Sequence, residues 1–119
     1  MARDTGSLLS FRPSIKVMDA TMRDGGLVNN FRFSDEWVRA LVSANMRAGV
    51  DYMELGYKSD RDLFDENKFG KWKFCRDEDV FNVLGGAPEG LKLACMADVG
   101  RCNYERDIGP RENSPFSMY

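Results

Sequence analysis

Two strand-like stretches separated by one capped helix most constrain the fold of this chain. Alternating side chains predict strands over residues 15–21 and 52–57. Between them, Ser34 begins a helix with an acidic first turn, and Gly49 ends it. Apolar residues recur at helical spacing within it, at Trp37, Val38, Leu41, Val42 and Met46. Because a crossover of this kind joins parallel strands, both strands should end at the same edge of one sheet.

The rest of the chain predicts a charged irregular segment, a short helix and a third strand. These are residues 58–76, with Trp72 and Phe74 as core anchors, residues 77–84, capped by Asp77 and ended by Gly85 and Gly86, and residues 91–98. No clear element is expected beyond Arg101. Three parallel strands alone leave open edges, which indicates the beginning of a larger α/β unit.

The composition excludes several classes of protein. A chain of 119 residues with 43% hydrophobic and 30% charged residues is typical of one globular domain. A net charge of −2 does not indicate the basic surface that nucleic-acid binding requires. No apolar run approaches the ~20 residues of a membrane helix. The three cysteines, Cys75, Cys95 and Cys102, form no CxxC pair and indicate idle or buried thiols. We expect a cytoplasmic protein, with an N-terminal extension over residues 1–13 and one domain over residues 14–119.

The run from Asp19 to Gly26 carries the candidate chemistry. Asp24 is a hard oxygen ligand that suits Mg²⁺ or Mn²⁺. Arg23 offers fixed donors to a developing oxyanion. Gly25 and Gly26 are expected to break regular structure here, so that the backbone passes close to a metal or substrate.

Glu54 is predicted to face the interior of the sheet or barrel. Simple alternation gives it the same face as Gly56 and the opposite face from Met53 and Leu55. A buried carboxylate is costly unless a cation pairs with it, and Arg23 is the natural partner. Arg23 and Glu54 are therefore the candidate catalytic residues.

Other polar residues near the strand ends have weaker patterns. Asp19, Asn29 and Asn30 are candidate substrate-binding residues, although the two asparagines also fit an ordinary polar loop. Asp98 and Arg101 fit a surface salt bridge as well as they fit a site. Lys58 follows a strand, but nothing beside it indicates a lowered pKa, so a surface role is favoured.

The joint pattern resembles the opening of the DRE-TIM metallolyases. It consists of Asp-x-Thr-x-Arg-Asp-Gly-Gly after a first strand, from Asp19, and Glu-x-Gly at the end of the second, from Glu54. This superfamily, also called the HMG-CoA lyase-like or pyruvate carboxyltransferase-domain family, includes 4-hydroxy-2-oxovalerate aldolases, HMG-CoA lyase, and isopropylmalate and homocitrate synthases. Residues 23–30 and 54–57 look most like a bacterial subgroup described as having an aldolase catalytic domain. The resemblance runs from about Ile15 to about Arg101.

The resemblance implies the N-terminal part, about three βα units, of a TIM (β/α)8 barrel. In it, Asp24 would bind the divalent metal, Arg23 would stabilise an enolate oxygen, and Glu54 would position the arginine or take part in acid–base chemistry. The implied reaction makes or breaks a carbon–carbon bond next to the carbonyl of a 2-oxo acid or acyl substrate. A small-molecule substrate is the expected partner, with no nucleic acid or membrane, and a homo-oligomer is compatible with the pattern.

The resemblance also predicts which metal ligands and which catalytic base are absent from these residues. The family's other metal ligands are a histidine pair on a late strand, and this chain contains no histidine. A whole barrel takes about 250 residues, so we expect these residues to cover roughly three strands and to be inactive alone. The related aldolases carry a histidine base shortly after Arg-Asp-Gly, whereas the neighbours of Leu27 offer none. Two alternatives stay open: a Claisen-type acyltransferase, and a non-catalytic barrel piece that binds a ligand or partner.

Overall fold

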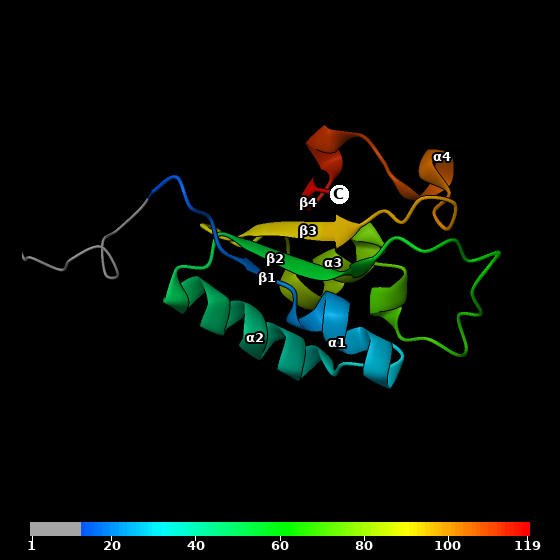
Figure 1. Ribbon diagram of the computed structural model, residues 1–119, viewed down its shortest axis with the longest axis horizontal. Helices are drawn as coiled ribbons and strands as arrows, with labels where there is room; N and C mark the ends of the chain where they lie inside the picture. Colours follow the sequence, from blue (N-terminus) through cyan, green and yellow to red (C-terminus); the bar gives the residue numbers. More distant parts are fainter. Residues whose placement is uncertain (1–12) are drawn as a thin grey trace, which may run out of the picture.

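The chain folds around a four-stranded parallel sheet with the strand order β1-β2-β3-β4 (Figure 1). The computed structural model describes residues 13–119. Its strands are β1 (Met18–Asp19), β2 (Tyr52–Tyr57), β3 (Lys92–Met96) and β4 (Phe116–Met118). Its helices are α1 (Thr21–Asn29), α2 (Asp35–Ala48), α3 (Asp77–Leu84) and α4 (Tyr104–Asp107), with short 3₁₀ turns η1 (Lys71–Lys73) and η2 (Arg111–Asn113). All but the last residue of the predicted extension, residues 1–13, lie outside the described part.

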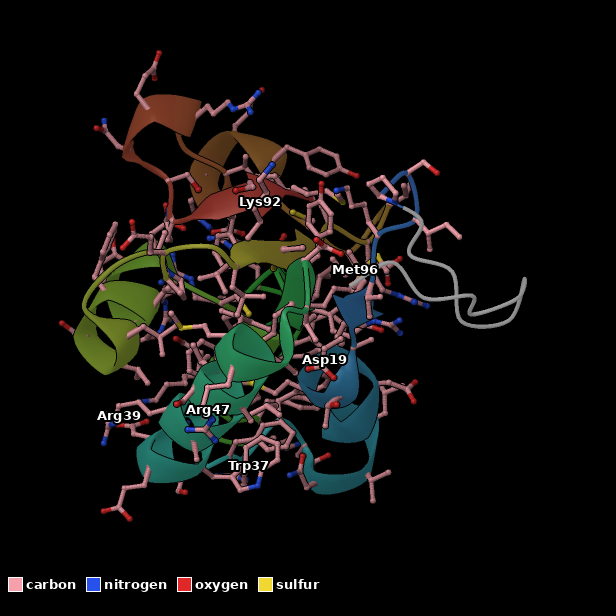
Figure 2. The ribbon with its side chains drawn as sticks, turned by 90° about the vertical axis from the view of Figure 1, so that its left-hand side faces the viewer. Asp19, Trp37, Arg39, Arg47, Lys92 and Met96 are labelled. Atoms are coloured by element: carbon pink, nitrogen blue, oxygen red, sulfur yellow. The ribbon has the colours of Figure 1, made fainter. Side chains whose placement is uncertain are left out.

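Helix α2 begins and ends as its sequence predicts. The Ser34 hydroxyl accepts a hydrogen bond from the backbone N–H of Trp37 at 3.2 Å, and Gly49 adopts a left-handed conformation with φ of 76°. On the outer side of α2, the Trp37 ring stacks on Phe33 with 4.8 Å between the ring centroids (Figure 2). The strand–helix–strand unit at the start of the chain is therefore confirmed.

The core lies between the sheet and the helices α2 and α3. Its members include apolar side chains from β2, β3, both helices and the residue before β3, among them Val38, Val42, Met53, Leu55, Val80, Val83, Leu91 and Leu93. The predicted anchors Trp72 and Phe74 are buried, at 0% and 4% exposure. Removing this apolar surface from water is the main term that holds the layers together.

A bulge in β2 changes which way its last residues point. Glu54 is in register with Ala94 and Tyr57 with Met96, so two residues of β2 lie opposite one residue of β3. The simple alternation predicted above is therefore wrong after Glu54: Tyr57, and not Gly56, shares the face of Glu54. Gly56 instead lies against η1, where a Cβ atom would come within 1.9 Å of the Trp72 carbonyl oxygen. Only glycine allows this contact.

The run from Thr21 to Asn29 forms helix α1, so the expected break at Gly25 and Gly26 is wrong. Glycine weakens a helix but does not prevent its backbone hydrogen bonds. Gly26 is needed because the Phe31 ring lies where its Cβ would be, within 2.0 Å. The helix ends instead at Asn30, which adopts a left-handed conformation with φ of 57°.

The two ends of the described chain also differ from expectation. The first strand, predicted over residues 15–21, is reduced to β1 because it lies at a sheet edge and α1 begins at Thr21. Beyond Arg101, where no element was expected, the chain forms α4, η2 and β4. These pieces are three or four residues long, and β4 exists through its pairing with β3, so local sequence patterns do not reveal them.

Lys58 is buried, at 2% exposure, which contradicts its predicted surface role. Its Nζ lies 2.8 Å from Oδ1 of Asp77, and Asp77 begins α3 without capping it through its side chain. Burial lowers the pKa of Lys58, but the hydrogen bond and charge of Asp77 outweigh it, so the pKa is raised. The bulge puts Lys58 on the opposite face from Glu54, where it meets Asp77 at the start of α3.

The sheet is open at both edges within the described residues. β1 and β4 each pair with one neighbour, and the sheet does not close on itself. The loop after β2 and the helix α4 lie at the end towards which the β2 and β3 arrows point (Figure 1). Among residues 13–119, no helix has the length and apolar character that a membrane span requires.

Replacing Gly56 with alanine should destabilise the protein by about 2 kcal/mol or more, because the new Cβ meets the backbone of η1. Gly25→Ala is the matched control, since nothing lies within 4 Å of its Cβ position and alanine favours a helix. Urea unfolding measures both. Equal unfolding free energies for Gly56→Ala and the original chain would contradict the close approach.

Candidate functional site

Arg23 and Glu54 form an ion pair just beyond the C-terminal end of β1, against the middle of β2. Nε of Arg23 lies 3.2 Å from Oε1 of Glu54. The side chains are 25% and 10% exposed, so the pair is largely shielded from water but remains within reach of a ligand. The pairing predicted from the sequence is therefore present, and it joins α1 to β2.

Tyr57 is a third member of this group, which we call the Arg23 cluster: Arg23, Glu54 and Tyr57. Tyr57 lies on the same face of β2 as Glu54. Burial acts to lower the pKa of Arg23, but the charge and hydrogen bond of Glu54, with a smaller contribution from Tyr57, raise it. Arg23 is therefore always positively charged, and the hydrogen bond from its Nε to Glu54 fixes the orientation of the guanidinium group. Tyr57 was not predicted from the sequence, because it reaches this face only through the bulge. No sequence pattern marks the bulge.

Asp19 fixes the position of α1. One of its carboxylate oxygens accepts the hydroxyl of Thr21, and the other accepts Nδ2 of Asn45 at 3.1 Å. Asn45 comes from α2 and is buried, so Asp19 ties β1, α1 and α2 together (Figure 2). Both oxygens of this predicted substrate-binding residue already have partners within the protein.

Asp24, the predicted metal ligand, lies on the exposed side of α1 with its side chain 76% exposed. Among residues 13–119 it makes one ion pair, with Arg23 at 3.9 Å. Within residues 13–119, no three histidine, cysteine or acidic side chains converge in a way that could hold a metal ion. Asp24 thus offers one oxygen ligand, and the described residues do not by themselves make a metal centre.

The remaining candidates do not join the Arg23 cluster. The Asn29 side chain bonds the backbone of Phe31 and Arg32, and Asn30 caps α1. Both stand about 9 Å or more along the α1 axis from Arg23, at 1.5 Å per residue. Asp98 and Arg101 pair with each other at 3.2 Å on the surface.

A separate cavity of about 520 Å³ lies beside Lys58 and the start of α3. Its lining includes Arg61, Arg76 and Arg106. Arg106 donates to the carboxylates of Asp60, Asp62 and Asp107, and Lys58 to that of Asp77. Because carboxylates of the chain already neutralise these cations, the cavity has little net attraction for an anion.

The shielded pair should be coupled more strongly than an exposed one. A double-mutant cycle with Arg23→Met and Glu54→Gln should give a coupling energy of about 1–3 kcal/mol in urea unfolding, because the pair is hydrogen-bonded and mostly out of water. The exposed pair of Asp98 and Arg101 is the control, with an expected coupling below about 0.5 kcal/mol. Equal coupling in the two pairs would contradict the shielding.

Comparison with known proteins finds a partial similarity. A stretch of 41 residues, 34% of this chain, is 42% identical to the oxaloacetate decarboxylase of Mycobacterium tuberculosis (strain ATCC 25618 / H37Rv). The matched stretch covers 12% of that protein. No protein-family model and no solved structure matches the chain. The similarity therefore covers only a short part of that decarboxylase.

Proposed function

We propose that this chain carries part of the active site of a lyase that breaks or forms a carbon–carbon bond next to the carbonyl of a 2-oxo acid. The observation that carries the proposal is the ion pair of Arg23 and Glu54 just beyond the C-terminal end of β1. Ligands of α/β proteins bind at this edge of a parallel sheet. The partial similarity to a protein named oxaloacetate decarboxylase supports the same reaction class.

Arg23 suits the charge that such a reaction develops. When the bond beside the carbonyl breaks, its electron pair moves to the carbonyl oxygen and gives an enolate. Glu54 engages Nε of Arg23, so the guanidinium can direct its outer N–H groups at that oxygen. Because Glu54 fixes the guanidinium in advance, little reorganisation is needed when the charge forms.

We further propose that the sheet is part of a (β/α)8 barrel and that Asp24 is one ligand of a divalent metal, Mg²⁺ or Mn²⁺. The parallel strands, the helices packed against them and the open edges support the barrel. A metal would supply Lewis-acid stabilisation of the same oxygen. Asp24 alone does not hold it, so the remaining ligands must come from residues other than those described.

Arg23→Lys should lower kcat for oxaloacetate decarboxylation by about 10²-fold or more in a preparation that holds this chain together with the remaining metal ligands, because a lysine cannot both bond Glu54 and reach the oxyanion. The release of pyruvate measures this. Arg32→Lys is the matched control, since Arg32 is an exposed arginine that bonds the backbone of Asn67. Near-original turnover by Arg23→Lys would refute the proposal. Turnover that requires an acyl thioester would favour the acyltransferase instead.

Titration of Mg²⁺ or Mn²⁺ into these 119 residues should show only weak binding, with a Kd in the millimolar range, because a single exposed carboxylate is one ligand of several. Isothermal titration calorimetry measures it, and Asp24→Asn should weaken it further. Submicromolar binding would contradict the assignment of the remaining ligands to other residues.

A further inference from the structure

Lys73 lies in an aromatic cup next to the Arg23 cluster. Its Nζ faces four ring centroids, at 4.1 Å from Phe64, 4.9 Å from Tyr57, 5.3 Å from Phe69 and 5.4 Å from Phe31. These rings come from the turn after α1, the end of β2 and the loop that follows β2. Segments that are distant in sequence therefore converge on one ammonium group.

The cup is held together by its own ring contacts. Phe31 and Tyr57 meet edge to face, with centroids 5.5 Å apart and an interplanar angle of 87°. Phe64 and Phe69 do the same at 5.9 Å and 84°. Edge-to-face pairs of this kind are favourable beyond the area that they bury. The rings thus fix the position of Lys73 without a ligand.

Lys73 forms no ion pair with any residue in the range 13–119, which sets it apart from its neighbours. Lys58 pairs with Asp77 at 2.8 Å, and Lys71 pairs with Asp35 at 3.1 Å. Burial lowers the pKa of Lys73; of the charged groups that act on it, Asp98 raises this pKa and Arg101 lowers it. The ring faces favour the charged form of Lys73 but do not neutralise it. An anion would therefore gain a strong, partly desolvated hydrogen bond here.

Tyr57 connects this cation to the candidate site. Its ring forms one wall of the cup, and the bulge puts it on the face of Glu54, the ion-pair partner of Arg23. We propose that Lys73 binds the carboxylate of the 2-oxo acid while Arg23 faces its carbonyl oxygen, which makes the aromatic cup the anion subsite of the active site. The 2-oxo acid as ligand rests on the function proposed above.

Pyruvate and its uncharged amide, pyruvamide, test the subsite in the same preparation. Lys73→Met should raise the Kd of pyruvate about tenfold or more, because a hydrogen bond to a charged group is lost, and should leave the Kd of pyruvamide within about twofold. Lys73→Arg keeps the charge and the ring contacts, and should restore most of the affinity for pyruvate. Lys68→Met, which removes an exposed lysine of the same loop, is the matched control.

The pH dependence provides a second readout. Pyruvate binding by the original protein should weaken as the pH rises through the pKa of Lys73, below the ordinary lysine value, and Lys73→Arg should remove this weakening. Equal loss of pyruvate and pyruvamide binding in Lys73→Met, or no preference of the original protein for pyruvate, would overturn the inference.

Exchange of the pyruvate methyl protons with solvent deuterium separates the inference from the proposed function. If the original protein catalyses this exchange and Lys73→Met binds pyruvate normally, the lyase proposal stands and the carboxylate subsite is wrong. If no exchange occurs but Lys73→Met loses pyruvate selectively, the subsite stands and the lyase proposal is wrong.

Discussion

The contact between Gly56 and the carbonyl of Trp72 is the constraint on which the candidate site depends. It lets η1 lie directly against β2, at the position where β2 has its extra residue. The same bulge places Tyr57 on the face of Glu54 and turns Lys58 towards Asp77 on α3. Close backbone packing at one glycine thus decides which polar groups meet at the end of the sheet and which are used to hold the helix layer.

Charge is distributed unevenly around this contact. Lys58 and the arginines of the neighbouring cavity are neutralised by carboxylates of the chain. Arg23 pairs with Glu54 and lies 3.9 Å from Asp24, whereas Lys73 has no carboxylate partner among residues 13–119 and is surrounded by aromatic rings. Because paired buried cations contribute to structure and an unpaired cation attracts anions, this distribution points to Lys73, and not to the cavity beside Lys58, as the place for an anionic ligand.

Much of the fold follows from local sequence. The Ser34 cap, the Gly49 stop and the apolar spacing of α2 are local signals, and the parallel arrangement of β1 and β2 follows from their connection. The pairing of Arg23 with Glu54 was also predictable, because a carboxylate on the inner face of a strand needs a cation. Helix α1 was not predictable, because a pair of glycines such as Gly25 and Gly26 usually ends a helix. Position 26 requires glycine because the Phe31 ring lies where a Cβ would be.

The sequence by itself determined the strand–helix–strand unit, the edge of the sheet where polar groups gather, and the cation that compensates Glu54, because caps, periodicity and charge are local or pairwise properties. The tertiary structure decided the rest: the burial of Lys58, the position of Tyr57, the aromatic cup around Lys73 and the short strand β4. Each of these depends on a bulge, or on contacts between segments far apart in the chain, and neither leaves a periodic pattern in the sequence.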